Sequence, residues 1–211
     1  PEFPELVDRV TARGCRVLSY GFKGEDIVLR KLEARPKGQD IEIEVMGETY
    51  SLILPLVGAF QVMNALCALG LVMAEAPDDQ DRNKEVMGHI ENLQGVPGRL
   101  QQVPGHTKGA VYVDYAHTPD ALQNILEALR PHTRKRLICL MGCGGDRDPR
   151  KRPVMGRIAA ELADLVVVTD DNPRTEDPEQ IRAQIMDAAL GAKEIGRRRE
   201  AIMWAVREME N

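Results

Sequence analysis

The residues with the clearest chemistry are Asp171-Asn172-Pro173-Arg174, which come soon after the apolar run 165–169. An Arg guanidinium can bind a carboxylate through two parallel hydrogen bonds, which a Lys ammonium cannot do. Pro173 fixes its own φ and biases Asn172 toward extended geometry, so Arg174 emerges from a stiff turn. Such a turn suits a small zwitterion, whose carboxylate and ammonium need opposite charges at fixed positions. It equally suits a helix-leading turn with a solvated Arg, and these residues alone leave both interpretations open.

Two more polar clusters follow apolar runs. Asp114-Tyr115-Ala116-His117 follows Val-Tyr-Val, and the loop 142–148, Gly-Cys-Gly-Gly-Asp-Arg-Asp, follows the run 137–141. In open α/β sheets, ligands bind beyond the carboxyl ends of the strands. Three such loops on one expected edge favour a ligand site over three solvated loops.

Each candidate in these loops has two interpretations. Asp114 can accept the ribose hydroxyls of a nucleotide, or it can be the charge partner of a helix N-terminus. His117 can donate to a phosphate, or it can belong to a helix cap. Arg147 offers a second fork for a carboxylate, or it pairs with Asp146 or Asp148. The glycines of the 142–148 loop allow unusual φ and close approach of a ligand.

Other polar residues stand outside these loops. Arg99 follows the Gly/Pro-rich hinge 95–98 and can reach a nucleotide held between the two halves of the chain. Asn64 lies in an apolar helix, where a buried amide is either satisfied by the fold or reads an adenine edge. The run 150–152, Arg-Lys-Arg, is typical of a solvated basic turn.

The first half of the chain must position Asn64. The runs 41–45 and 50–54 predict a β-hairpin with Gly47 first in its turn. The stretch 58–76 is apolar on nearly all sides, which predicts a buried helix. Further expected elements are strands at 16–20 and 26–29 and an amphipathic segment at 83–93.

The second half alternates strand and helix patterns. The expected strands are 111–115, 137–141 and 165–169. The expected helices are one capped by Thr118 with Pro119 in its first turn, then 153–163, 178–190 and about 200–209. This βαβαβα order implies α/β architecture with parallel strands and right-handed crossovers.

Composition narrows the class of protein. A hydrophobic content of 43%, a charged content of 29% and a net charge of −5 fit a globular chain and argue against a nucleic-acid partner. No apolar run reaches the roughly 20 residues of a membrane span, and no signal peptide opens the chain. The four cysteines form no CxxC pair or zinc pattern. We expect a reduced, cytoplasmic monomer without membrane insertion, cut from something longer.

Five segments together resemble the Mur ligases and run in the family order. They are Gly-Ala-Phe-Gln-Val-Met-Asn at 58–64, Gly-Arg at 98–99, Asp-Tyr-Ala-His-Thr-Pro-Asp at 114–120, the 142–148 loop and Asp-Asn-Pro-Arg at 171–174. Within the family, they look like the branch that adds meso-diaminopimelate to UDP-N-acetylmuramoyl-L-alanyl-D-glutamate. The resemblance implies that residues 1–97 are the distal part of a central α/β ATPase domain. It further implies that residues 98–211 are an incomplete, Rossmann-like C-terminal domain with a mostly parallel sheet and flanking helices.

The resemblance also implies a reaction. ATP, with Mg²⁺, would phosphorylate a carboxylate of the UDP-sugar dipeptide, and the amine of diaminopimelate would displace phosphate from the acyl phosphate. By similarity the ATP-binding residues are Asn64, Arg99, Asp114 and His117. By similarity the diaminopimelate-binding residues are Arg147, Asp171, Asn172, Pro173 and Arg174. Arg174 would pair with the distal carboxylate that lysine lacks.

The chain departs from the family pattern in several places. Gln61 stands where the family usually has Asn, and no GxxxxGK[ST] loop, carbamylated lysine or Gly-Lys-Gly-His-Glu segment is present. We therefore assign no catalytic residue and no metal ligand here, and expect this chain to be inactive alone. The alternatives are a folylpolyglutamate synthetase-like ligase and a non-catalytic module that binds a nucleotide or an amino acid.

Overall fold

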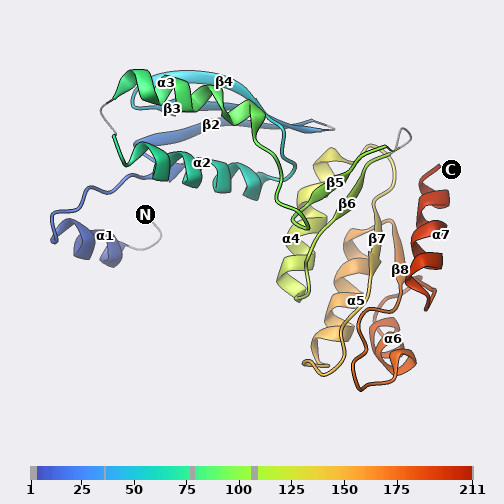
Figure 1. The fold of residues 1–211 in the computed structure, drawn as a ribbon. Helices are drawn as coiled ribbons and strands as arrows, with labels where there is room; N and C mark the ends of the chain where they lie inside the picture. The colour runs from blue at the N-terminus through green and yellow to red at the C-terminus, as the bar shows by residue number, and fades with distance from the viewer. Residues whose placement is uncertain (1–3, 36, 77–78, 106–108, 211) are drawn as a thin grey trace. The chain divides into compact units, whose positions relative to one another are not determined.

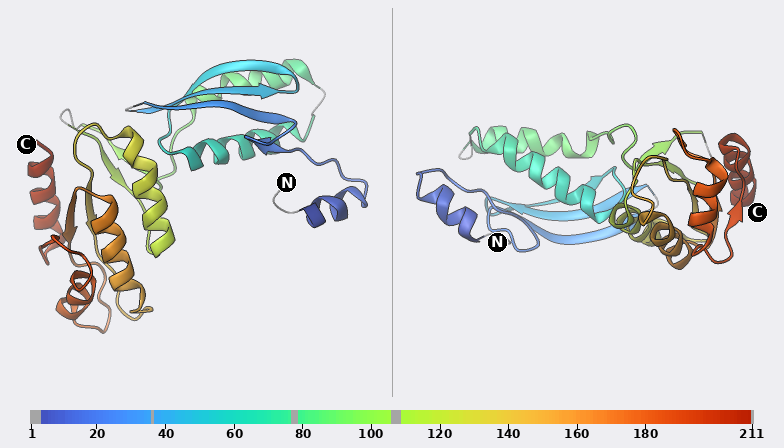
Figure 2. Two further views of the ribbon diagram at one scale, coloured as in Figure 1. Left: turned by 180° about the vertical axis from the view of Figure 1, so that it is seen from behind. Right: turned by 90° about the horizontal axis from the view of Figure 1, so that it is seen from below.

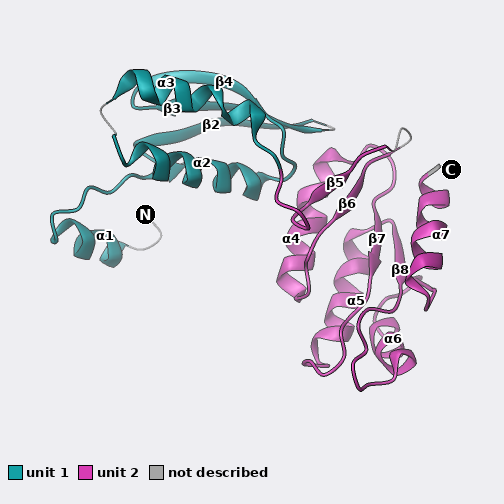
Figure 3. Ribbon diagram, in the orientation of Figure 1, with its two compact units in different colours: residues 1–94 teal, residues 95–211 magenta. Residues whose placement is uncertain are grey.

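The computed structural model describes residues 4–35, 37–76, 79–105 and 109–210 (Figure 1). The chain forms two compact units, residues 1–94 and 95–211, which Figure 3 distinguishes by colour. Each unit is described by itself.

The first unit is a sheet covered by helices. The sheet has the order β1-β2-β3-β4, with antiparallel pairing from β2 to β4 and a short parallel pairing of β1 with β2. Its elements are α1 (Pro4–Thr11), β1 (Tyr20–Gly21), β2 (Ile27–Arg35), β3 (Gly38–Val45), β4 (Glu48–Leu54), α2 (Ala59–Met73), α3 (Gln80–Gly88) and the 3-10 helix η1 (Ile90–Asn92). The expected strand 16–20 is wrong except for its last residue, and the amphipathic segment at 83–93 corresponds to the end of α3 followed by η1.

The predicted hairpin is confirmed as β3 and β4, but its turn differs in one detail. Val45 pairs with Glu48, so the loop is Met46-Gly47, with φ of 48° and 85°. Two positive φ values give a type I′ turn, whose twist matches that of the strands. Gly47 is thus second in the loop, not first, and Met46 adopts a conformation that is uncommon for a residue with a side chain.

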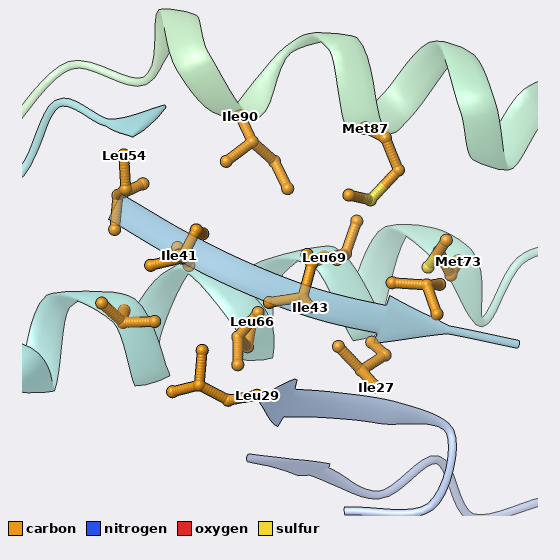
Figure 4. Packing of buried hydrophobic residues seen from close by; sticks show 13 residues of the cluster. Ile27, Leu29, Ile41, Ile43, Leu54, Leu66, Leu69, Met73, Met87 and Ile90 are labelled. Atoms are coloured by element: carbon orange, nitrogen blue, oxygen red, sulfur yellow. The ribbon is translucent and has the colours of Figure 1, made fainter. Parts of the chain in front are cut away.

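The core of the first unit lies between the sheet and α2, α3 and η1 (Figure 4). Alternate residues of β3 are buried, among them Ile41 and Ile43, because a strand presents successive side chains to opposite faces. Full burial of such a side chain contributes roughly 1.5–3 kcal/mol. The expectation that α2 is buried on nearly all sides is wrong. Leu71 is 70% exposed, and Asn64 is exposed as well.

The second unit contains two sheets. β5 and β6 are antiparallel, whereas β7, β8 and β9 form a parallel sheet in that order. Its strands are β5 (Gln101–Val103), β6 (Val111–Val113), β7 (Ile138–Met141), β8 (Leu165–Val168) and β9 (Lys193–Glu194). Its helices are α4 (Pro119–Leu129), the 3-10 helix η2 (Arg130–His132), α5 (Lys151–Leu162), α6 (Pro178–Met186) and α7 (Arg198–Glu210).

The predicted α/β architecture with a parallel sheet and flanking helices is confirmed, with one correction. Among the described residues, β6 is paired only with β5, so the first expected strand does not belong to the parallel ladder. Helices α4, α5 and α6 pack side by side, and α7 packs against β7 and β8 from the other side (Figures 1 and 2). This arrangement brings the loops after β7 and β8 to one edge of the sheet.

The start of α4 follows from local chemistry. Thr118 Oγ1 accepts a hydrogen bond from Ala121 N at 3.3 Å, and Pro119 occupies the first helical turn. Leu122, Leu126 and Leu129 then recur on its buried face. Over the part of the chain that is described, we find no helix with the length and apolarity needed to cross a membrane.

Candidate functional site

The loop after β7, residues 142–148, and the segment after β8, residues 170–176, lie against each other; we call them the loop pair. Gly145 N donates to the Asn172 carbonyl at 2.9 Å, and Arg174 Nη1 donates to the Gly145 carbonyl at 2.5 Å. Because β7 and β8 are parallel neighbours, their carboxyl ends share one edge. The structure thus joins two of the three polar clusters that the sequence singles out.

The glycines of the 142–148 loop make this contact possible. A Cβ on Gly145 would lie 1.9 Å from the Pro173 carbonyl oxygen, and a Cβ on Gly142 would lie 2.3 Å from the Thr169 carbonyl oxygen. Gly142, Gly144 and Gly145 all lack a positive φ. The expectation of unusual φ is therefore wrong. The space beside Gly142 and Gly145 is filled by backbone, and that beside Gly144 by the Arg174 guanidinium.

Arg174 is held in a defined but open position. Its side chain is exposed, and its φ of 51° lies in the left-handed region. Asn172 Oδ1 accepts a hydrogen bond from Arg174 N at 3.2 Å, which closes the turn. Gly145 O binds one end of the guanidinium, and no carboxylate of the described residues pairs with it. Its remaining N–H groups can donate to the carboxylate of a ligand.

Arg147 lies in the first loop of the loop pair and is exposed. The expected alternative, an ion pair with a neighbouring aspartate, is not what the structure has. Asp148 binds Arg150 Nε at 2.9 Å, and Asp146 accepts a hydrogen bond from Thr175 Oγ1 at 2.7 Å. Within the described residues, the Arg147 side chain has neither a hydrogen bond nor an ion pair, so it is open to a ligand.

Asp171 and Pro173 line a shallow depression beside the loop pair. Cys143 also lines it; burial raises the pKa of its thiol, and Sγ contacts Met155 Sδ at 3.9 Å. A protonated, buried thiol is a small core side chain rather than a nucleophile. Asp170 and Arg182 also line the depression and pair with each other, so the Asp171 carboxylate is its remaining charged group.

An ion pair between a buried arginine and a partly exposed glutamate joins the two loops of the loop pair. Arg152 is 0% exposed, and its guanidinium binds both carboxylate oxygens of Glu176 at 2.7 and 2.8 Å. This hydrogen bonding, together with a 2.5 Å bond from Asp146 N, lowers the pKa of Glu176 to about 2. The expectation that 150–152 is a solvated turn is wrong for Arg152. The same expectation misses a hydrogen bond of Lys151, whose Nζ donates to the His117 carbonyl at 2.6 Å.

A second group of side chains consists of Arg99, before β5, and Asp114, Tyr115 and His117, after β6. We call it the nucleotide cluster because the sequence predicts nucleotide binding for three of its members. Asp114 accepts hydrogen bonds from Leu100 N and Ala116 N, both at 2.7 Å. The Arg99 guanidinium lies 5.0 Å from the centroid of the Tyr115 ring, and the Tyr115 and His117 rings meet edge to face at 5.1 Å.

The nucleotide cluster shows that Asp114 is not the charge partner of a helix N-terminus. Instead, it ties the segment before β5 to the end of β6. Its carboxylate keeps further lone pairs for the hydroxyls of a ligand. The exposed Arg99 guanidinium and the His117 ring, whose Nδ1 lies 3.0 Å from the Tyr115 carbonyl oxygen, form its surface.

Asn64 lies in the first unit, whereas the other candidate residues belong to the second. It is exposed on α2, and its Nδ2 donates to Gln61 Oε1 at 3.2 Å. The premise of a buried amide is therefore wrong, although the amide remains open to a ligand.

The described side chains do not form a metal site. They contain no group of three or more His, Cys, Asp or Glu residues able to hold an ion. The residues present therefore do not make a Mg²⁺ site by themselves, and no Mg²⁺ ligand is assigned in this chain.

An open parallel sheet with polar loops at its carboxyl edge defines an α/β ligand-binding unit. The family described as "Mur ligase, glutamate ligase domain" matches residues 98–211, more than half of the chain, and "Mur ligase middle domain" matches residues 1–72. The chain belongs to the Mur ligase family.

The curated relatives are consistent with one branch of that family. The chain is 51% identical over 97% of its length to the UDP-N-acetylmuramoyl-L-alanyl-D-glutamate–2,6-diaminopimelate ligase of Caulobacter vibrioides. It is 48% identical over 98% of its length to the protein of the same name from Brucella melitensis. It spans 41% and 42% of these relatives, about two fifths of their length.

Solved structures agree at the level of the fold. A UDP-N-acetylmuramoyl-L-alanyl-D-glutamate–2,6-diaminopimelate ligase superposes with a TM-score of 0.71 at 33% identity, over 98% of this chain and 43% of that one. A folylpolyglutamate synthase of Mycobacterium tuberculosis superposes with a TM-score of 0.73 at 22% identity, over 100% and 47%. The second likeness is one of fold alone, so it does not favour the folylpolyglutamate alternative.

Proposed function

We propose that the polypeptide carrying this chain is an ATP-dependent ligase that joins meso-diaminopimelate to UDP-N-acetylmuramoyl-L-alanyl-D-glutamate during peptidoglycan synthesis. The names of relatives at about half identity support this assignment. The dipeptide carboxylate attacks the γ-phosphorus of ATP and releases ADP. The amine of diaminopimelate then attacks the acyl carbon, and the C–O bond to phosphate breaks as the amide forms.

The observation that carries the substrate assignment is the state of Arg174. Its guanidinium is anchored at one end by Gly145 O and has no carboxylate partner among the described residues. We assign it to the distal carboxylate of diaminopimelate, with Asp171 opposite the distal ammonium and Arg147 as a second cation. Asn172 and Pro173 shape the turn that presents Arg174. Lysine has no distal carboxylate, so it would leave Arg174 without its charge partner.

We assign ATP to the remaining candidates. Asp114 would accept ribose hydroxyls, Arg99 and His117 would face the phosphates, and Asn64 would read the adenine edge. Mg²⁺ would accompany the phosphates, held by groups outside the described residues. In this assignment residues 1–97 are the distal part of the ATPase domain and residues 98–211 are most of the C-terminal domain.

The reaction and its substrates make the cytoplasm the expected compartment. We further propose that the ligase acts as a monomer without nucleic-acid or membrane partners. The chain lacks a phosphate loop, so we expect residues 1–211 alone to turn over no ATP. The second candidate is a non-catalytic binding module. The lack of a phosphate loop favours it only for residues 1–211 in isolation.

The test is a product assay on the full polypeptide that carries this sequence. UDP-N-acetylmuramoyl-L-alanyl-D-glutamate, ATP and Mg²⁺ are incubated with either meso-diaminopimelate or L-lysine, and the nucleotide-sugar products are resolved by mass. We expect one tripeptide product and one phosphate released per amide, with diaminopimelate preferred. Equal use of lysine would overturn the assignment of Arg174, and phosphate release without any amide would overturn the ligase.

A further inference from the structure

We propose that Arg152 and Glu176 are positioning residues, a clamp with a buried guanidinium that fixes the loop pair so that Arg174 and Arg147 point at one bound amino acid. This inference rests on the proposed function. Neither residue is expected to touch the substrate, because Arg152 is 0% exposed and Glu176 faces Arg152 and the loop backbone.

The clamp reaches both halves of the loop pair. Arg152 Nη1 and Nη2 bind the two oxygens of Glu176, and Nη2 also donates to the Gly144 carbonyl at 3.3 Å. Glu176 Oε1 in turn accepts the Asp146 N–H at 2.5 Å. A single ion pair thus connects Gly144 and Asp146 of one loop to the residue two positions after Arg174. Gln184 of α6 accepts a further hydrogen bond from Arg152 Nη1 at 2.8 Å.

The two loop residues nearest the clamp are strained. Asp146 and Arg174 have φ of 52° and 51°, a conformation that costs a residue with a side chain of order 1–3 kcal/mol and persists only where surrounding contacts impose it. Glu176 holds the N–H of Asp146, and Asp146 in turn holds Thr175 through Oγ1 at 2.7 Å. The same contacts therefore fix the backbone just before Arg147 and just after Arg174.

A buried charge is not an effective way to increase the stability of the fold. Replacing a buried ion pair with apolar side chains of similar volume is often neutral or stabilising. Arg152 shares its helix face with Met155, Gly156 and Ala159, which are all buried, so an apolar residue would suit this face. What an apolar residue cannot supply is two donors for Glu176 and one for Gly144, the contacts that set the loop geometry.

The experiment compares apparent KM values in the full polypeptide. Glu176→Gln preserves size and the acceptor for Asp146 N but removes the charge and one acceptor from Arg152. We expect the KM for diaminopimelate to rise on the order of 10-fold, with the KM for ATP within about twofold. For Arg152→Lys we expect a smaller rise in the KM for diaminopimelate. The Lys ammonium keeps the positive charge beside Glu176, although it cannot reproduce the two-donor guanidinium fork. The matched control is Arg150→Gln, a neighbouring exposed arginine bound to Asp148, which should leave both constants unchanged.

A double-mutant cycle with Arg174→Ala separates positioning from general stability. If Glu176 acts through Arg174, Glu176→Gln should add little to the KM for diaminopimelate once Arg174 is gone. Additive effects, equal rises in both KM values, or failure of both clamp variants to fold would overturn the positioning role. Failure of the wild-type polypeptide to join diaminopimelate would instead count against the proposed function, so the two failures are distinguishable.

Discussion

The loop pair and the nucleotide cluster are built in opposite ways. The loop pair is held by backbone hydrogen bonds, a close backbone contact at Gly145 and the ion pair between the buried Arg152 and Glu176. In the nucleotide cluster, by contrast, exposed side chains contact one another, with the Arg99 guanidinium over the Tyr115 ring. The main hydrogen bonds to the backbone are those that the Asp114 carboxylate accepts.

This difference fits the two ligand classes that we propose, an amino acid for the loop pair and a nucleotide for the nucleotide cluster. Discriminating amino acids that differ by one carboxylate requires donors at fixed positions, so rigidity has a direct use. A nucleotide is larger and offers many contacts, so its side chains can order on binding. We therefore expect changes in the loop pair to alter stability and amino-acid selection together, and changes in the nucleotide cluster to alter nucleotide use with smaller effects on stability.

The largest effect is expected from Gly145→Ala. The added Cβ would lie 1.9 Å from the Pro173 carbonyl oxygen, so the two loops must separate. We expect the free energy of unfolding to fall by at least about 2 kcal/mol, measured by urea denaturation. Gly191→Ala is the control: nothing lies within 4 Å of its added Cβ, and only its φ of 76° is unfavourable, at about 1 kcal/mol. Equal losses for the two variants would contradict close packing of the loop pair.

Acidification should weaken the loop pair next. The Arg152 guanidinium and the Asp146 N–H hold the pKa of Glu176 at about 2, below its ordinary value of 4.5. The folded state therefore binds the proton less readily, so this stabilisation is complete above about pH 4.5 and is lost as the pH falls toward 2. Urea titrations at pH 6, 4 and 3 should show the stability gap between wild type and Glu176→Gln narrowing. A gap that stays constant would contradict this sign.

A moderate effect is expected from Asp114→Asn in the nucleotide cluster. Both carboxylate oxygens accept backbone N–H groups, and an amide can replace only one of those acceptors. We expect a loss of about 1 kcal/mol in unfolding free energy and a raised KM for ATP, with an unchanged KM for diaminopimelate. Asp120→Asn, an exposed change in the first turn of α4, serves as the control. A change in the KM for diaminopimelate would contradict separate roles for the nucleotide cluster and the loop pair.

The smallest effect on stability is expected from Arg99→Ala. Its stacking on Tyr115 is exposed, so removal should cost about 0.5–1 kcal/mol or less by thermal denaturation. The KM for ATP should nevertheless rise, because Arg99 is proposed to face the phosphates. Unchanged ATP use would remove Arg99 from the nucleotide site.

Local chemistry in the sequence predicted much of this arrangement. The Thr118–Pro119 start of α4, the β3–β4 hairpin and the strands β7 and β8 followed from capping, turn residues and apolar runs. The strands β5 and β9 were missed because three and two residues are too few to show an alternating pattern. The pairing of β6 with β5 depends on tertiary contacts that its own residues do not encode.

The site was predicted less completely, and Arg152 shows why. Three adjacent basic residues suggested a solvated turn, which a local view of charge favours. The signal that was missed is periodic: Arg152, Met155, Gly156 and Ala159 recur at the spacing of one helix face, and that face is buried. Glu176 gave no such signal, because its importance depends on a partner 24 positions away.

The central claim is that Arg174 in the loop pair recognises the distal carboxylate of diaminopimelate. It is tested most directly by calorimetric titration of the full polypeptide with meso-diaminopimelate and with L-lysine, for wild type and Arg174→Ala. The account predicts that wild type binds diaminopimelate roughly 10- to 100-fold more tightly than lysine, and that the variant loses this preference. A wild type without preference, or a variant that keeps it, would contradict the claim.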